Sequence, residues 1–469
     1  MTIIINRLSL EKKHQDYRSL KYTLSALESA INSVQPEFLV RRALKRNCSK
    51  LLITDIRGIK QEFDINGFKS IFVVGAGKGT AKMARAVSRI LKGKITSGAI
   101  NVPYGNKITL DSIYVSEANH PIPDEAGVEG TKRIIDILKN TQESDLVFVL
   151  ISGGGSALMP LPVGNLKLEE KKKITHKLLA SGASIDEINT VRKHLSLIKG
   201  GQLVRFVKRG CTIVSLILSD VIGDNIETIA SGPTVPDVSS FKDAAIILQK
   251  YHIFENRSLE KSSLSLIIKN GLRGDIADTP KPGSSIFDKV YNFLIGNNSI
   301  ACNKAVQTLR KNRIQAIYLG SSFNGQAMDF GKMLAKLTND FAISSLPIAF
   351  VLGGETTVKL NKRRENGTGG RNQEAILSAA TKCKFQYRND ITIACMGTDG
   401  IDGNSAAAGG LLTPKSIYLI QKKSINIKNY LKGHNSYTAL KKIGSLLFTG
   451  YTGTNVNDIA IICLMNRLS

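Results

Sequence analysis

The sequence lacks a hydrophobic run long enough to cross a membrane. Its longest runs, such as LVFVLI at residues 146–151, are far shorter than the roughly 18 apolar residues that a transmembrane helix needs. The first 20 residues contain only a short apolar run and carry Glu11 and Asp16, which fits neither a signal peptide nor an acid-poor transit peptide. We therefore expect a cytoplasmic protein with no membrane partner.

Cysteine is scarce as well, with six residues in a chain of 469. The cysteines are scattered along the chain, at Cys48, Cys211, Cys302, Cys383, Cys395 and Cys463. No two of them have the Cys-x-x-Cys spacing that zinc and redox sites use. This excludes a site of that kind, and we expect reduced, structural thiols.

Acidic residues are few relative to basic ones, 38 against 64, which gives a formal net charge of +26. Such an excess can indicate a nucleic-acid partner, but the basic residues are spread along the chain and no zinc-finger, RRM or basic-zipper pattern accompanies them. We therefore expect no nucleic-acid partner and interpret the excess as a solvated surface that also favours a small polyanionic substrate. A basic nucleic-acid-binding protein is the alternative from another functional class.

Strand-like runs alternate with helix-like runs along almost the whole chain, which is typical of βαβ units and a parallel sheet. The predicted strands run into glycine, serine, asparagine or an acid, as at residues 70–75, 145–152, 211–220 and 391–400. Ligands bind beyond the carboxyl ends of such strands, so we expect the site there. The length and the 42% hydrophobic content predict an α/β protein of two domains. An irregular, inter-domain connection is expected between about residues 238 and 290.

Three consecutive glycines follow a predicted buried strand in FVLISGGGSALMP, residues 148–160. Without Cβ atoms, backbone N–H groups can come within hydrogen-bonding distance of a bulky anion, and a phosphate is the first candidate. The alternative is a tight strand-to-helix turn with unusual dihedrals. The candidate phosphate-binding residues are Ser152, Gly153, Gly154, Gly155 and Ser156. GGGSAL is not a G-x-S-x-G motif, which argues against a serine hydrolase.

A second glycine-rich turn lies in IFVVGAGKGTAKMARAV, residues 71–87, between a predicted strand and a predicted helix. Gly75, Gly77 and Gly79 are spaced G-x-G-x-G, which differs from the dinucleotide fingerprint G-x-G-x-x-G. Lys78 lies inside the turn, so this is not a Walker A motif either. The pattern predicts N–H donors and an ammonium group that bind phosphate at a helix N-terminus, with a surface lysine as the alternative.

Charged residues follow strands in three further loops. Asp220 and Asp224, in LSDVIGDNIE, can hold Mg²⁺ or accept a proton from a substrate hydroxyl, although Asp224 can also cap a helix. Asp399 and Asp402, in TDGIDG, are the second choice for a metal site. Arg371, in GTGGRNQE, precedes a predicted helix and can clamp phosphate oxygens bidentately.

Taken together, the motifs are specific. They occur in the order GAGKGTAKMA, HPIPDEAG, LISGGGSAL, INTVRKHLSLIKGG, LSDVIGDNIETIASGPT, GGETTV, GTGGRNQE, GTDGIDG and TGTNVND. With them the chain strongly resembles the type II glycerate kinases (glycerate 2-kinases), whose C-terminal part is the MOFRL domain. The resemblance implies phosphorylation of D-glycerate at its 2-hydroxyl by ATP and Mg²⁺, giving 2-phosphoglycerate.

The resemblance also implies an architecture and residue roles. It predicts a doubly wound, Rossmann-like domain at 18–237, a connecting segment at 238–290 and a MOFRL domain with a smaller mixed sheet at 291–466, with the active site in the cleft between the domains. The family's essential lysine and arginine correspond to Lys78 and Arg371. Since glycerate is an anion, Arg192, His194 and Lys199 are candidate partners for its carboxylate, with an exposed helix surface as the alternative.

Three positions depart from the pattern of that family. Tyr451 stands where proline is usual, Asn119 where glycine is usual, and Gln326 where a glutamate is usual. Gln326 lacks the carboxylate of that glutamate, and this difference affects the expected detail of the substrate or metal site. A kinase for another small hydroxy acid is the alternative enzyme, because a pocket discriminates one methylene by only about 1–3 kcal/mol. A homodimer is compatible with the sequence.

Overall fold

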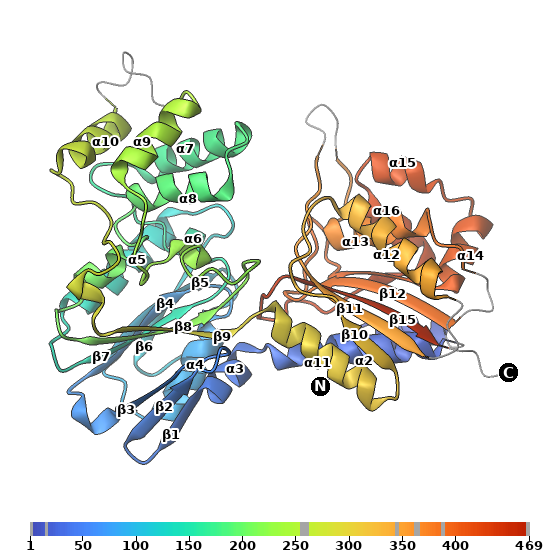
Figure 1. The fold of residues 1–469 in the computed structure, drawn as a ribbon, viewed down its shortest axis with the longest axis horizontal. Coiled ribbons are helices and arrows are strands. Elements are labelled where there is room, and N and C mark those ends of the chain that lie inside the picture. The colour runs from blue at the N-terminus through green and yellow to red at the C-terminus, as the bar shows by residue number, and fades with distance from the viewer. Residues whose placement is uncertain are drawn as a thin grey trace. The chain divides into compact units, whose positions relative to one another are not determined.

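The computed structural model describes residues 3–14, 17–253, 262–342, 347–360, 366–385 and 390–465. Contacts divide the chain into two compact units, which Figure 1 shows as ribbons. The parallel-sheet unit comprises Pro36–Gly296. The mixed-sheet unit comprises Met1–Gln35 together with Asn297–Ser469.

The parallel-sheet unit is built on six parallel strands in the order β6-β5-β4-β7-β8-β9. The strands are β4 (Ile71–Ala76), β5 (Ser97–Pro103), β6 (Ile113–Ala118), β7 (Leu146–Ile151), β8 (Thr212–Leu218) and β9 (Val290–Gly296). Every residue of β4, β7 and β8 is buried, because both faces of the sheet are covered, and such strands are uninterrupted apolar runs. The strand order reverses between β4 and β7, so the predicted doubly wound, Rossmann-like sheet is confirmed.

Helices cover both faces of this sheet, with α5 on one face and α3 and α4 on the other (Figure 1). These helices and the short α6 are α3 (Pro36–Ala43), α4 (Thr80–Leu91), α5 (Glu125–Lys139) and α6 (Gly155–Leu158). Four more share a separate apolar core: α7 (Leu168–Ala180), α8 (Ile185–His194), α9 (Phe241–Lys250) and α10 (Ser263–Arg273). A small antiparallel sheet consists of β1 (Leu44–Asn47), β2 (Lys50–Thr54) and β3 (Lys60–Asp64).

The mixed-sheet unit has six described strands in the order β10-β11-β15-β12-β13-β14, of which only β10 and β11 pair in parallel. The strands are β10 (Gln315–Tyr318), β11 (Ile348–Gly354), β12 (Asp390–Gly397), β13 (Gly409–Leu412), β14 (Leu446–Leu447) and β15 (Asp458–Met465). The predicted mixed sheet is therefore confirmed, and it has as many strands as the parallel sheet.

Helices cover both faces of the mixed sheet too (Figure 1). One face carries α2 (Arg18–Ser33), which follows α1 (Arg7–Lys13), and α11 (Asn298–Lys311). The other carries α12 (Ala327–Phe341), α13 (Arg371–Ala380), α14 (Pro414–Lys422), α15 (Ile427–Lys432) and α16 (Ser436–Ile443).

The N-terminal helix α2 belongs to the mixed-sheet unit, whereas the domain predicted at 18–237 includes it. Its apolar stripe is fully buried, at Leu20, Leu24, Leu27 and Ile31. The N–H groups of Arg18 and Ser19 each donate to the carboxylate of Asp390, at the start of β12, at 3.0 Å. Helix burial and charged hydrogen bonds both hold this N-terminal segment on a sheet formed by residues far along the chain.

The predicted connecting segment at 238–290 is part of the parallel-sheet unit. Its described residues form α9 and α10, whose apolar side chains share a core with α7 and α8, while residues 254–261 lie outside the described residues. The strand β9, predicted for the second domain, pairs in parallel with β8 and buries Phe293 and Leu294. The unit therefore extends to Gly296.

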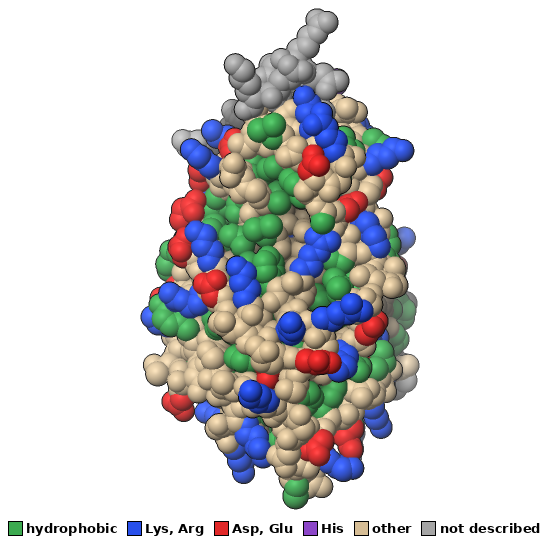
Figure 2. Space-filling view, turned by 90° about the vertical axis from the view of Figure 1, so that its left-hand side faces the viewer, with side chains coloured by type: hydrophobic (Ala, Val, Ile, Leu, Met, Phe, Trp, Pro, Cys, Tyr) green, Lys and Arg blue, Asp and Glu red, His purple; other side chains and the backbone are tan. Residues whose placement is uncertain are grey.

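Three general features of the described chain bear on the composition. In its described parts, no helix combines the length and apolar character needed to cross a bilayer. Figure 2 views the molecule from the left-hand side of Figure 1, and there Lys and Arg lie interspersed with acidic and apolar side chains. The six cysteines, which all fall in the described ranges, are free thiols.

Candidate active site

The first group of predicted site residues lies at the carboxyl edge of the parallel sheet, where the strand order reverses. β4 leads through Lys78 into α4, and its neighbour β7 leads into the triple glycine. The N–H of Lys78 donates to the carbonyl of Gly153 at 2.8 Å and so joins the two turns. Gly154 has a φ of +83°, and a Cβ there would lie 2.8 Å from Cδ2 of His120 and 3.5 Å from Cγ of Lys78. Lys78 and His120 thus flank Gly154 at the place where such sheets bind ligands.

Close packing explains the glycines of the first turn. A Cβ at Gly75 would lie 2.0 Å from the carbonyl O of Leu150, and one at Gly77 would lie 2.1 Å from Oγ of Ser152. The N–H of Gly77 donates to a carbonyl of β5 at 3.2 Å, and that of Gly79 donates to Oγ of Ser152 at 2.9 Å. These contacts give Gly75, Gly77 and Gly79 a packing role, and the N–H groups of Gly77 and Gly79 already have partners; their phosphate-binding role stays a prediction.

Only part of the triple-glycine turn remains a candidate for binding an anion. The N–H of Gly155 donates to the carbonyl of Ser152 at 3.2 Å and tightens the turn. The carbonyl of Gly153 already accepts the bond from the first turn. The bond from Gly155 supports the tight-turn interpretation for that residue, whereas a bond to the carbonyl of Gly153 does not engage its N–H. Gly153, Gly154 and Ser156 stay candidates for contact with a ligand.

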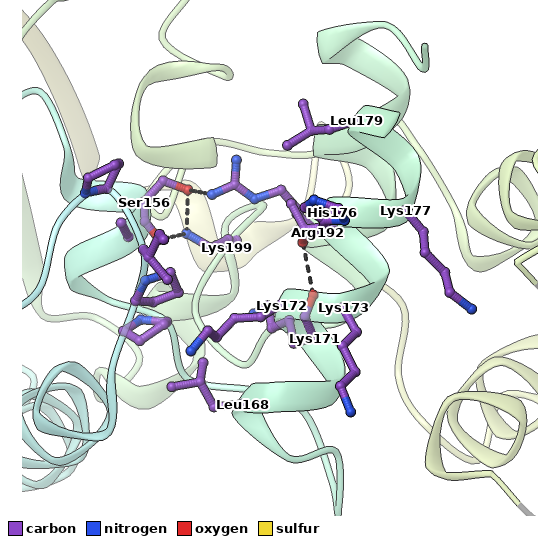
Figure 3. Close-up of a pocket in the computed structure, with 16 residues that line it drawn as sticks. Ser156, Leu168, Lys171, Lys172, Lys173, His176, Lys177, Leu179, Arg192 and Lys199 are labelled. Carbon is purple, nitrogen blue, oxygen red and sulfur yellow. Dashed lines mark hydrogen bonds between the residues drawn. The ribbon is translucent and has the colours of Figure 1, made fainter. Parts of the chain in front are cut away.

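A cavity of about 630 Å³ opens beside Ser156, a volume typical of small-molecule sites. Its apolar walls include Pro121, Ile122, Pro160, Leu168 and Leu179. Lys and Arg side chains line the same cavity: Lys171, Lys172, Lys173 and Lys177 from α7, Arg192 from α8, and Lys199 from the segment after α8. Figure 3 shows Arg192 and Lys199 converging on Ser156.

Three of these cations, Lys171, Arg192 and Lys199, have no acidic partner among the described residues, whereas Lys172 pairs with Glu169 at 2.6 Å. Nη2 of Arg192 donates to Oγ of Ser156, and Nζ of Lys199 donates to the same Oγ at 2.8 Å and to the Ser156 carbonyl at 2.9 Å. Nζ of Lys171 has no hydrogen-bond partner, although this residue is only 6% exposed. No carboxylate of the described chain pairs with any of the three. The predicted phosphate ligand Ser156 and two predicted carboxylate ligands therefore form one site with Lys171.

While no anion is bound, burial lowers the pKa of all three cations and so favours their neutral forms. Burial first, and then the charge of Arg192, lower the pKa of Lys171 to about 7. Burial also lowers the pKa of Lys199 well below its ordinary value, with further contributions from Arg192 and Lys171. The pKa of Arg192 is lowered by burial as well. An anion in the cavity would favour the charged forms and raise all three values.

His194, the third predicted carboxylate ligand, does not line this cavity. Its Nε2 lies 2.8 Å from Oδ1 of Asp278, and its Nδ1 lies 2.8 Å from the carbonyl O of Thr190. The ring also packs edge-on against Phe241, with the centroids 4.8 Å apart. Both ring nitrogens therefore lie within hydrogen-bonding distance of Asp278 and Thr190, so His194 is separate from the cavity and its role as a carboxylate ligand stays a prediction.

The predicted metal ligands Asp220 and Asp224 follow β8 at the same edge of the sheet, and both are half-buried. Asp224 has a φ of +57°, and its N–H donates to the carbonyl of Val221 at 3.1 Å, so it lies in a turn. The next short helix has Thr228 as its N-cap, which excludes the capping alternative for Asp224. The described residues contain no group of three Asp, Glu, His or Cys side chains that could hold a metal.

In the mixed-sheet unit, Arg371 begins α13 and is fixed by two carboxylates. Its Nε and Nη2 donate to Asp458 at 2.5 and 3.0 Å, and its Nη1 donates to Glu355 at 2.6 Å. Asp458 begins β15 and Glu355 follows the adjacent strand β11. Burial lowers the pKa of Arg371, but the charges of Asp458 and Glu355 outweigh it and raise the pKa above its ordinary value. The guanidinium is therefore charged and held in one orientation.

Asp402, a second-choice metal ligand, instead caps α13. Its Oδ1 accepts from the N–H of Asn372 at 3.1 Å, and its Oδ2 accepts from the N–H and the side-chain amide of Gln373 at 2.8 and 2.9 Å. Burial, followed by the charge of Asp458, raises the pKa of Asp402 to about 6 despite these bonds. A cation would have to displace them, so Asp402 does not fit a metal. Asp399 accepts from the N–H of Ile401 at 3.1 Å and stays a candidate.

The three positions that depart from the family pattern each interact with nearby residues. Gln326 joins two loops, since its Nε2 donates to Thr357 at 3.2 Å and its Oε1 accepts from a backbone N–H at 3.3 Å. The backbone of Asn119 hydrogen-bonds to Asp124. Burial first and then the charge of Asp399 raise the pKa of Tyr451.

Sequence reasoning missed several residues of these two groups. Lys171 lies in the run EEKKK, which is typical of a solvated helix face. Glu355 and Asp458 occur in the motifs GGETTV and TGTNVND, and His120 occurs in HPIPDEAG. For Glu355, Asp458 and His120, the available signal was an acid or a histidine inside a motif. Only the fold shows which residues each of them contacts.

Comparison with known proteins gives matches over most of the chain. A model described as "Domain of unknown function (DUF4147)" matches residues 22–264, and one described as "MOFRL family" matches residues 348–458. A glycerate 2-kinase of Pyrococcus horikoshii is 41% identical over 448 residues, covering 95% of this chain and 97% of its own. A D-glycerate 2-kinase of Thermotoga maritima is 38% identical over 412 residues, covering 86% and 93%. A crystal structure of glycerate kinase from Thermotoga maritima aligns with a TM-score of 0.80 at 35% identity, covering 95% of this chain and 99% of that one.

Proposed function

Because the chain belongs to the glycerate kinase family that carries the DUF4147 and MOFRL domains, we propose that it transfers the γ-phosphoryl group of ATP to the 2-hydroxyl of D-glycerate. The product is 2-phosphoglycerate. The observation that carries this conclusion is the similarity to two glycerate 2-kinases over most of their length and of this chain. Phosphoryl transfer asks a protein mainly for positioning and neutralisation of charge, and the described residues offer both.

Lys78 is the residue of the parallel-sheet unit that we assign to the transferred phosphoryl group. It lies where the order of strands reverses, directly before α4, and its backbone is tied to Gly153. The flanking Gly154 has no Cβ, so a phosphate can approach the backbone closely there. The ammonium group of Lys78 would neutralise charge that develops on the phosphoryl oxygens.

Arg192 and Lys199 are assigned to the carboxylate of glycerate. Lys199 is buried and Arg192 is half-buried, neither has an acidic partner among the described residues, and both donate to Ser156 in a cavity of suitable size. A bound carboxylate would accept from them and offset the cost of burying their charge. Substrate orientation by these contacts would place the 2-hydroxyl, which is on the carbon next to the carboxylate, for the transfer.

Arg371 is the residue of the mixed-sheet unit that we assign to catalysis. Three hydrogen bonds to Asp458 and Glu355 fix its planar fork. A fixed guanidinium can stabilise charge in a phosphoryl-transfer transition state without reorganising.

Mg²⁺ would shield the phosphate charges of ATP when it is bound. Asp220 and Asp224 are the carboxylates that we assign to it, since they follow β8 at the carboxyl edge of the parallel sheet and neither is fully buried. Two carboxylates are enough, because Mg²⁺ usually takes its remaining ligands from substrate phosphates and water.

Replacing Asp220 or Asp224 with asparagine should raise the Mg²⁺ concentration that gives half-maximal activity, by roughly tenfold or more, because a carboxylate contributes charge that an amide lacks. The measurement is a Mg²⁺ titration of initial rates at saturating ATP. The exposed Asp111→Asn serves as control. If neither variant shifts the titration, the ion is held elsewhere, with Asp399 as the next residue to test.

The proposed activity is tested by measuring ADP release from the full-length chain with ATP, Mg²⁺ and a panel of D-glycerate, L-glycerate, D-lactate and glycolate. D-glycerate should give the highest kcat/KM. A higher value for another acid would favour the alternative kinase, and no ADP release above the acid-free background with any of them would contradict the proposal. A cytoplasmic location and a homodimer remain predictions.

A further inference from the structure

The cluster of Lys171 and Lys199, which are buried, and Arg192, which is half-buried, differs from the buried Lys193 beside it. The adjacent Lys193 is also buried, and its Nζ pairs with Asp237 at 3.0 Å. The three cavity residues have no carboxylate partner in the described chain, and Nζ of Lys171 has no hydrogen bond at all. Buried charges are normally paired, so an unpaired cluster that lines a cavity indicates an anionic ligand.

The charge of these three residues is informative about that ligand, although Lys172, which pairs with Glu169, and Lys173 and Lys177 line the cavity as well. When all three are protonated the cluster carries three positive charges, whereas glycerate brings a single carboxylate. 2-Phosphoglycerate brings that carboxylate and a phosphate of about −1.5 to −2 charge at pH 7, on adjacent carbon atoms. The charge of the product therefore matches the cluster more closely than the charge of the substrate does.

We propose that Lys171, Arg192 and Lys199 form one oxyanion pocket that binds the adjacent carboxylate and phosphate groups of 2-phosphoglycerate, with Lys171 as a ligand residue. The identity of the ligand rests on the proposed function. In 3-phosphoglycerate the phosphate is one carbon farther from the carboxylate, so the two groups fit the same cluster less well. The pocket would thus favour a phosphate at the 2-position over the 3-position.

A solely structural role for Lys171 is at odds with its surroundings. A lysine that stabilises a fold has a carboxylate or carbonyl acceptor, and this one has none. Burial lowers its pKa to about 7, below the value of 10.5 in an unfolded chain, so the folded state binds its proton more weakly. Stability is therefore reduced by this group at neutral pH and below. Replacing Lys171 with methionine should leave the melting temperature unchanged or raise it.

The test is isothermal titration calorimetry on the full-length chain without ATP, using 2-phosphoglycerate, 3-phosphoglycerate and D-glycerate as ligands. The wild type should bind 2-phosphoglycerate at least tenfold more tightly than either of the others. Lys171→Met should weaken 2-phosphoglycerate binding by roughly 10- to 100-fold, the usual effect of losing a hydrogen bond to a charged group. Lys132→Met, which removes an exposed lysine of the same unit, should not change binding.

Melting curves of both variants and a second replacement, Lys171→Gln, separate ligand binding from folding. Weaker binding by both Lys171 variants, with unchanged or higher melting temperatures, supports the proposal. Binding of 2-phosphoglycerate by Lys171→Gln within threefold of the wild type would overturn it, as would an equal loss in Lys132→Met. Because no turnover is measured, this result is independent of whether the chain phosphorylates D-glycerate.

Discussion

Replacement of Lys78 with alanine should lower kcat by about 10²- to 10³-fold, the usual effect of removing one group that stabilises charge in a transition state. The melting temperature should change little. Lys78 is only half-buried, and the bond that joins its turn to Gly153 comes from its backbone N–H, which alanine keeps. The measurement is kcat at saturating ATP and D-glycerate, together with a melting curve.

Lys94→Ala is the matched control for Lys78. Lys94 follows α4 in the same unit, is exposed, and its Nζ donates to Oδ1 of Asn66 at 3.0 Å. Its replacement removes the same charge from the chain and should leave kcat unchanged. A Lys78→Ala enzyme that retained a tenth of the wild-type kcat would show that Lys78 is an ordinary surface lysine.

Replacement of Arg371 with lysine should be the most damaging conservative change, with kcat reduced by about 10³-fold or more, as for arginines that stabilise phosphoryl transfer. Lysine keeps the charge but cannot reproduce the planar fork that binds Asp458 through two nitrogens and Glu355 through a third. The two carboxylates would then be partly unpaired, so the melting temperature should fall as well.

Arg310→Lys controls for the loss of a bidentate arginine in the same unit. Nε and Nη2 of Arg310 donate to the carbonyl of Ala316 at 3.1 and 2.9 Å, away from the acids around Arg371. This change should reduce stability modestly and leave kcat unchanged. Near-normal kcat in Arg371→Lys would remove Arg371 from the proposed mechanism and leave it a structural ion pair.

The fold could be predicted largely because of the way parallel sheets are covered. β4, β7 and β8 are buried on both faces, so each is an uninterrupted apolar run that ends in the polar residues of the site. The domain boundaries are harder to predict from the sequence. α2 is amphipathic and would suit either sheet, and its packing on β12 and β15, together with the bonds of Arg18 and Ser19 to Asp390, shows that it belongs with the C-terminal strands.

The motifs indicate which residues belong to the candidate site, but the roles of these residues are harder to predict. The sequence places Lys78, Ser156, Arg192 and Lys199 in motifs, but it does not show which strands are neighbours. The contacts of Gly75 with Leu150 and of Gly77 with Ser152 depend on that pairing, so the packing role of these glycines cannot be predicted from the sequence alone.

Burial of single side chains was harder still to predict. Lys171 and Lys172 are adjacent in the same lysine run, yet the first is buried and without a partner, while the second pairs with Glu169 at 2.6 Å. The orientation of α7 decides between these outcomes, and it depends on packing against helices that are distant in sequence.

The most direct test of the proposed function is the position of the phosphate in the product. The full-length chain is incubated with ATP, Mg²⁺ and D-glycerate, and the product is identified by ³¹P NMR against standards of 2- and 3-phosphoglycerate. We expect 2-phosphoglycerate as the sole phosphorylated acid, formed at a rate that falls with Lys78→Ala and not with Lys94→Ala. Formation of 3-phosphoglycerate, or of no phosphoglycerate at all, would contradict the proposed activity.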